Sequence, residues 1–200
     1  MARFRTLAIA WLVATLVPLA AASAQDGARA YLERKHEEVN RILRQPASER
    51  RTERLRVLLN DLLDYPELSR RALGEHWDQR SESERQQFVD LLRRLVERNY
   101  EGNLEQIVDF EVTYDRESRR GDLTVVHTTA RSRAQRRQPP VQIDYTMRQV
   151  DGRWRVVDVA TDGVSMVDNY RAQFHRIIAR DGWSELIARM QRRLEQGSEG

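Results

Sequence analysis

The chain has 200 residues, of which 40% are hydrophobic, and it carries 34 Lys and Arg against 31 Asp and Glu, a formal net charge of +3. That length is enough for one domain with a sizeable buried core. Cysteine is absent, which excludes disulfides and thiolate chemistry, so stability has to come from the core.

Residues 1–24 have the pattern of a secretory leader. Two arginines precede an apolar run from Leu7 to Val17, and a small-residue A-x-A site ends at Ala24, before Gln25. The alternative is a membrane anchor, but the run is shorter than the roughly 20 residues that span a bilayer. We therefore expect export to the periplasm, with cleavage near Ala24-Gln25.

Removal of this leader changes the charge argument. It takes two arginines away and leaves 32 basic against 31 acidic residues. A basic chain usually suggests nucleic acid, but a nearly neutral mature chain with evenly mixed signs does not. We expect no nucleic-acid partner. Residues 25–196 are predicted to form a single domain, and 197–200 a disordered tail.

Four helices are predicted before residue 108, because apolar residues recur at helical spacing. The second shows a stripe of leucines, and Gly74 closes the short third helix. Ser81 and Glu84 form a capping box. The helices begin, in order, at residue 28, after the N-cap Ser48, at Pro66 and after Ser81.

From Val108 the apolar period changes to two, which is typical of strands. Short connections, including a type I′ signal at Asp151-Gly152, make these strands an antiparallel meander. Helices resume at 164–180 and 183–196. The pattern predicts an α+β domain in which helices wrap a four-stranded sheet. The predicted strands are 108–115, 122–131, 140–150 and 153–160.

The segment 152–178 is the most informative part of the chain. Its strand carries apolar residues on both faces, so both faces should be covered. After the turn at Asp162-Gly163, apolar residues return at helical spacing. A strand that turns into a helix in this way can form the wall of an apolar cavity.

The same segment resembles the MlaC family, also called the toluene-tolerance auxiliary component. The resemblance is carried by Asp158-Val159, Asp162 to Ser165 and Asn169 to Arg171, and upstream by Leu68 to Gly74 with Trp77. It spans nearly the whole mature chain. It implies an NTF2-like curved sheet with an N-terminal helical subdomain.

The resemblance also implies a function, that of a periplasmic carrier of phospholipid between the inner and outer membranes. Such a chain would be the soluble component of an ABC-type lipid transport system and would need no cofactor. The implied partners are an inner-membrane ABC transporter with a ring of MCE subunits, an outer-membrane lipoprotein complexed with a porin and, transiently, the membrane surface.

A carrier of this kind needs a dry pocket of aliphatic and aromatic side chains with a wet mouth for the head group. Tyr170 and Arg171 are candidates for the mouth, although a core tyrosine beside a surface arginine is an equal alternative. The candidate lipid-binding residues are Leu91, Leu95, Tyr100, Tyr145, Met147, Val156, Val157, Val159, Val164, Met166, Val167, Tyr170, Arg171, Phe174 and Ile178.

Signatures of catalysis are missing from the sequence. His36 begins an H-E-x-x-H pattern, but Asn40 replaces the second histidine. His76, His127 and His175 are far apart in the sequence, so no metal site is predicted. Two alternatives remain, an NTF2-like enzyme that uses Asp144 or His127 and a non-catalytic envelope adaptor with a filled interior.

The segment 131–137 is the densest charge cluster. Four of its seven residues are arginine. We interpret it as a solvated loop, and the alternative is attraction to an anionic bilayer or an acidic partner.

Overall fold

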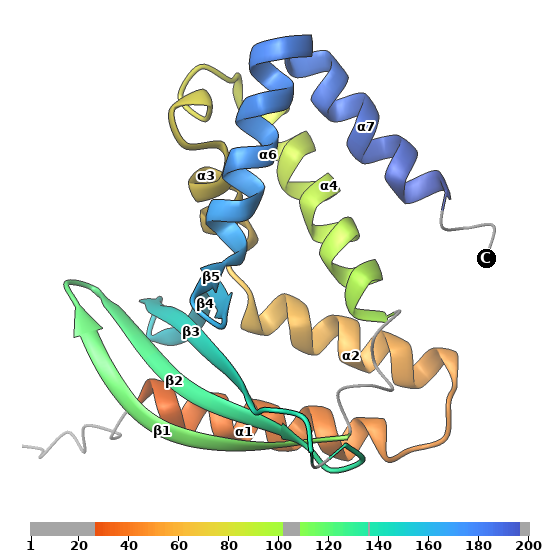
Figure 1. The fold of residues 1–200 in the computed structure, drawn as a ribbon. Coiled ribbons are helices and arrows are strands. Elements are labelled where there is room, and N and C mark those ends of the chain that lie inside the picture. Colours follow the sequence, from red (N-terminus) through yellow and green to blue (C-terminus); the bar gives the residue numbers. More distant parts are fainter. Residues whose placement is uncertain (1–26, 102–108, 136, 197–200) are drawn as a thin grey trace, which may run out of the picture.

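The computed structural model describes residues 27–101, 109–135 and 137–196 (Figure 1). The predicted leader, 1–24, and the predicted tail, 197–200, lie outside these ranges. Helices, then an antiparallel sheet, then helices follow one another along the chain, which confirms the α+β prediction. Across the described residues, no helix is long and apolar enough to cross a membrane.

The α-helices of the first group begin within one residue of the predicted starts, and all but the first have a side-chain cap. The Ser48 side chain accepts from the Arg51 amide, and Ser81 and Glu84 form the predicted capping box. Asp64, which was not predicted as a cap, caps the third helix. The helices are α1 (Ala28–Leu43), α2 (Glu49–Leu62), α3 (Tyr65–Leu73), the 3₁₀ turn η1 (Gly74–His76) and α4 (Glu82–Glu101).

The sheet has five antiparallel strands in sequence order. Asp151 and Gly152 both have positive φ, as the predicted type I′ turn requires, and Asp162 with Gly163 repeats this geometry. The strands are β1 (Phe110–Arg120), β2 (Leu123–Ser132), β3 (Val141–Val150), β4 (Arg153–Thr161) and β5 (Val164–Ser165).

Strand β1 and strand β5 differ from the prediction. A bulge at Asp115 moves the pairing from Tyr114↔Thr128 to Arg116↔His127, so β1 continues to Arg120 after its apolar alternation has stopped. The short strand β5 was predicted as the start of a helix. It pairs with β4 and then leads into α6 (Met166–Asp181), which α7 (Trp183–Gln196) follows.

Two parts lie side by side in Figure 1. Helix α1 lies along one face of the curved sheet, and α3, α4, α6 and α7 form a bundle beyond the β4 and β5 edge. Each part has its own apolar core, which we call the sheet cluster and the bundle cluster. Leu63 packs against both, so the two clusters meet at the α2–α3 junction.

The same junction is held by polar contacts. The Asp64 amide donates to the carbonyl of Val156 in β4 at 3.0 Å. The Asp64 carboxylate accepts from Nε and Nη2 of Arg148 in β3, at 3.0 and 2.8 Å. Because Asp64 is only 8% exposed, this ion pair is a specific link between sheet and bundle.

Candidate functional site

The candidate site is an apolar hollow inside the helical bundle. Its volume is about 10 Å³, which is room for about one water molecule. Side chains from α3, α4 and α6 line it, and none is charged. The lining residues are Leu68, Ala72, Leu92, Val96, Met166, Val167 and Tyr170.

Aromatic rings close the bundle around this hollow. The ring of Tyr170 stacks on Phe174 with centroids 5.5 Å apart, and Phe174 meets Phe88 of α4 edge to face at 5.5 Å. The ring of Trp183 in α7 also lies next to Phe88, with centroids 5.8 Å apart. These contacts join α4, α6 and α7 through one aromatic row.

Helix α6 is positioned by its first turn. The Ser165 hydroxyl accepts from the amide of Asp168 at 3.1 Å and donates to Asp158 of β4 at 2.6 Å. The other oxygen of Asp158 accepts from the Val167 amide at 3.1 Å. These bonds fix the end of α6 to β4, and they point Val167 into the hollow.

The structure divides the predicted lipid-binding residues between the two clusters. Seven belong to the bundle cluster and four to the sheet cluster, so they do not form one continuous wall. The bundle cluster contains Leu91, Leu95, Met166, Val167, Tyr170, Phe174 and Ile178. The sheet cluster contains Tyr145, Met147, Val156 and Val159.

The four remaining residues have different surroundings. Val157 is fully buried at a bulge of β4, whereas Val164 is 64% exposed on β5. Arg171 donates to the carbonyl of Arg71 at 2.8 Å and to Asp168 at 3.0 Å. The side chain of Tyr100 lies outside the described part of the structure.

The hollow also includes four residues that were not predicted, Leu68, Ala72, Leu92 and Val96. Leu92 lies in the fourth predicted helix, and Leu68 lies in the upstream part of the family resemblance. Neither signal separates a side chain that lines a hollow from one that packs against a neighbour. The sequence therefore predicts burial but not the hollow.

A half-buried polar contact lies beside the sheet cluster. His36 of α1 hydrogen-bonds through Nδ1 to the hydroxyl of Tyr114, and its ring lies 5.4 Å from that of Tyr145. Burial lowers the pKa of His36 to about 4. The ring is therefore neutral at physiological pH.

A second hollow is an open groove of about 310 Å³ along α4. Half of its lining residues are charged, and the Arg85 guanidinium lies over the Trp77 ring at 5.3 Å. An acyl chain needs dry apolar surroundings, so this groove suits it less well than the bundle interior. The lining residues are Pro66, Trp77, Glu82, Arg85, Gln86, Val89, Asp90 and Arg93.

The residues of the enzyme alternative are in contact with each other. His127 Nδ1 lies 2.8 Å from Asp144 Oδ1, and His127 Nε2 lies 2.9 Å from the Ser118 hydroxyl. These side chains come from three adjacent strands, and neither hollow includes any of them. The contacts join β1, β2 and β3 across the sheet.

The arginine-rich segment 131–137 is exposed at its described arginines, Arg131, Arg133 and Arg137. Arg136 lies outside the described residues. The Arg133 amide donates to the Asp109 carbonyl at 2.7 Å, which ties the segment to the start of β1.

Three comparisons with known proteins bear on the fold and the family. The model of the family described as MlaC protein matches residues 33–192. A Haemophilus influenzae protein, named intermembrane phospholipid transport system binding protein MlaC, is 24% identical over 145 residues, which cover 70% of this chain and 68% of that protein.

A solved structure from Ralstonia solanacearum, described as a phospholipid-binding protein in complex with a phospholipid, has a similar fold. Its TM-score is 0.71 at 23% identity, and the match covers 86% of this chain and 98% of that one. At this identity the likeness establishes the fold.

Proposed function

The chain belongs to the MlaC family, since the family model spans residues 33–192, and from this premise we propose that it carries phospholipid across the periplasm between the inner and outer membranes. The observation that carries the proposal is the uncharged hollow between α3, α4 and α6. The described relatives support it, because both are named for phospholipid.

Water is the barrier that such a carrier removes. Exposing an acyl chain to water costs a free energy of roughly 0.8 kcal/mol per methylene. For two chains of about 16 carbons each, this cost is on the order of 25 kcal/mol. A dry aliphatic interior replaces the bilayer at similar free energy, so lipid can both enter and leave. This step needs binding alone, without a nucleophile, metal or cofactor.

The bundle must open to hold a lipid. A hollow of about 10 Å³ is far smaller than an acyl chain. The acyl chain would enter when α6 moves away from α3 and α4. Its contacts would then replace those that Met166, Val167 and Tyr170 make with α3 and α4. We infer that the sheet cluster stays closed, because a half-buried hydrogen bond between His36 and Tyr114 joins α1 to the sheet there.

The partners of the chain would be the membrane complexes of the proposed lipid transport system. By its family, the chain would receive lipid from, or deliver it to, an inner-membrane ABC transporter with an MCE ring and an outer-membrane lipoprotein–porin complex. The exposed arginines of segment 131–137 are suited to contact an anionic membrane surface or an acidic partner during this exchange.

Native mass spectrometry of the protein purified from the periplasm tests the function. We expect a mature chain with about one diacyl phospholipid bound, which organic extraction then identifies. A population that carries no lipid in any charge state, with no phospholipid in the extract, would overturn the proposal.

A matched pair of variants tests the placement of the site. Val167→Trp adds more bulk than the hollow can hold and blocks the proposed path of the acyl chain, whereas Val164→Trp adds the same bulk at a position 64% exposed, three residues away. We expect Val167→Trp to lose lipid and Val164→Trp to retain it, with both folded by circular dichroism. If folded Val167→Trp retained lipid as well as Val164→Trp does, the lipid would not occupy this hollow.

A further inference from the structure

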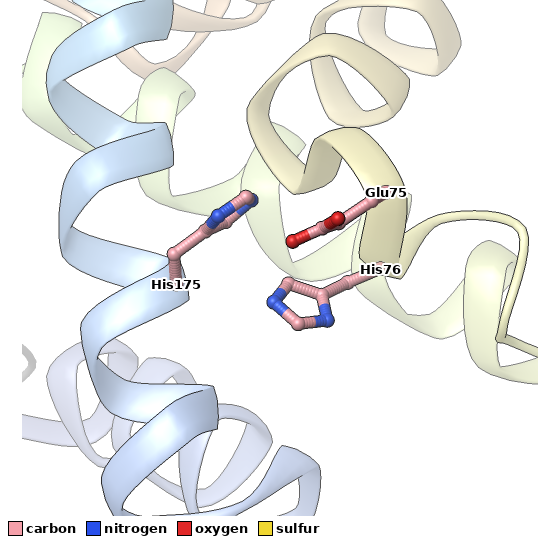
Figure 2. A group of neighbouring side chains, drawn as sticks. All are labelled: Glu75, His76 and His175. Atoms are coloured by element: carbon pink, nitrogen blue, oxygen red, sulfur yellow. The ribbon is translucent and has the colours of Figure 1, made fainter.

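Two histidines that are 99 residues apart in the sequence meet where η1 lies against α6. His76 lies in η1 and His175 in α6, and their ring centroids are 4.5 Å apart (Figure 2). Glu75 extends its carboxylate toward the same space. One ligand atom from each of Glu75, His76 and His175 lies within 4.8 Å of the other two.

The turn before η1 makes this approach possible. Gly74 has a φ of +53°, and a Cβ at that position would lie 3.4 Å from Nε2 of His175. A larger residue would be strained in that conformation, although its Cβ would only be in ordinary contact with the ring. Gly74 therefore closes α3 and lets the chain turn toward His175.

The His175 ring is already oriented. Its Nε2 lies 2.8 Å from the carbonyl oxygen of Leu73, and a carbonyl only accepts, so Nε2 carries the hydrogen. The lone pair then resides on Nδ1. Histidines that bind metal usually donate their other ring nitrogen to a carbonyl or carboxylate in this way.

The other two side chains are not committed elsewhere. The buried Nδ1 of His76 has no hydrogen-bond partner within the described ranges. Glu75 is exposed, and its carboxylate makes neither a hydrogen bond nor an ion pair with the part of the chain that is described. The nearby Arg171 guanidinium is occupied by Asp168 and by the Arg71 carbonyl.

We propose that Glu75, His76 and His175 form a binding site for a divalent transition-metal ion of the Zn²⁺ class. Two imidazoles and one carboxylate are a donor set that Zn²⁺ prefers, with a fourth position open to water. A tetrahedral site separates its donors by roughly 3.3 Å, so ligand atoms that lie within 4.8 Å of one another would have to move closer when the ion binds.

A bound ion would join η1 to α6. It would therefore fasten the end of α3 to the helix that, with α3, lines the apolar hollow. None of the three residues of this site lines the hollow, so metal binding can be measured in the absence of lipid. Its test measures metal, so it can succeed or fail whatever the protein does with lipid.

The test uses the untagged mature protein, stripped with a chelator and titrated with Zn²⁺ by calorimetry. We expect one Zn²⁺ per chain and a higher Tm in its presence. His76→Ala and His175→Ala should each weaken Zn²⁺ binding at least about tenfold. Loss of a group that only hydrogen-bonds to a metal ligand already lowers metal affinity about 10–100-fold. His127→Ala, a histidine on the sheet, is the matched control and should bind as the wild type does.

A further variant separates the loss of a metal ligand from the loss of the fold. Glu75→Gln changes an exposed side chain, so it should keep the wild-type Tm without metal while it weakens Zn²⁺ binding. Co²⁺ in place of Zn²⁺ should give the strong visible absorption of a tetrahedral site, and His76→Ala should abolish it. Absence of stoichiometric Zn²⁺ binding, or equal binding by His127→Ala and His76→Ala, would overturn the site.

Discussion

At the scale of single residues, a few buried polar side chains set how stability responds to pH. His36 is kept neutral by burial against Tyr114 and Tyr145. Burial alone would raise the pKa of Glu67, but hydrogen bonds from Arg70 and Arg71 outweigh it and bring the pKa down to about 2. Both groups make the folded protein less stable in acid, in different pH windows.

His36 sets how the free energy of unfolding changes in the less acidic of the two pH ranges. Its pKa is about 4 in the folded protein and about 6.5 when unfolded, so below pH 6.5 only the unfolded chain gains the proton. The free energy of unfolding should fall by about 2 to 3 kcal/mol from pH 6.5 to pH 4 and lose this slope below pH 4. His36→Gln should remove that slope when urea unfolding is measured across the window. An unchanged slope in His36→Gln would contradict the assignment.

Glu67 acts at lower pH. Its carboxylate is favoured in the folded state, so its contribution is present above pH 4.5 and is lost as pH falls toward 2. The His36→Gln variant should therefore keep this second, more acidic loss of stability.

The second prediction at this scale concerns the ion pair between Asp64 and Arg148. Asp64→Asn keeps a good helix cap but removes the charge, and it should cost about 2 kcal/mol, below the usual range because Arg148 is 30% exposed. Asp64→Ala also loses the cap and should cost about 1 kcal/mol more. Both are read from urea unfolding midpoints.

Asp168→Asn is the control for this pair. Its carboxylate also binds an arginine, but its side chain is 69% exposed, so the change should stay within about 0.5 kcal/mol. If Asp64→Asn cost no more than Asp168→Asn, the sheet and bundle would not be linked as described.

At the scale of elements, the starts of helices were predictable because their signals are local. Ser48 and the Ser81–Glu84 box sit next to the turns that they cap, and Asp151-Gly152 adopts positive φ in its own turn. The junction between β4 and α6 follows the same rule, since Ser165 caps α6 and also holds Asp158.

Ser165→Ala tests that junction. Loss of the cap should destabilise the protein by about 1 kcal/mol, because the Asp168 amide loses its acceptor. Urea unfolding should show a lower midpoint at an unchanged m-value. Ser184→Ala removes the same hydroxyl from an exposed position on α7 and should leave the midpoint unchanged. Equal midpoints for the two variants would mean that Ser165 does not hold α6.

Elements whose signal is not local were harder to predict. The far half of β1 follows a bulge at Asp115, which shifts the side-chain alternation, so the sequence pattern ends while the strand continues. His76 and His175 meet only because η1, which follows α3, lies against the middle of α6. Leu91 and Leu92 are adjacent and similarly buried, yet only Leu92 lines the hollow. Burial can be predicted from the helical spacing of apolar residues along one helix. The hollow depends on how α3, α4 and α6 pack against one another.

At the scale of the whole molecule, the two apolar clusters have different tasks in our account. The sheet cluster is a closed core with a neutral histidine at its edge, and the bundle cluster contains the uncharged hollow. They meet at Leu63 beside the Asp64–Arg148 pair. Separation of α6 from α3 and α4 would open the bundle while this junction holds the sheet in place.

The most direct test of this account is to map where a bound lipid lies. The protein would be loaded from vesicles that contain a phospholipid with a photoactivatable group at the end of one acyl chain, repurified, irradiated and digested for mass spectrometry. We expect adducts in α3, α4 and α6, at residues such as Leu68, Val96 and Met166. Adducts confined to α1 and the sheet, or no adduct above that of a lipid lacking the photoactivatable group, would contradict it.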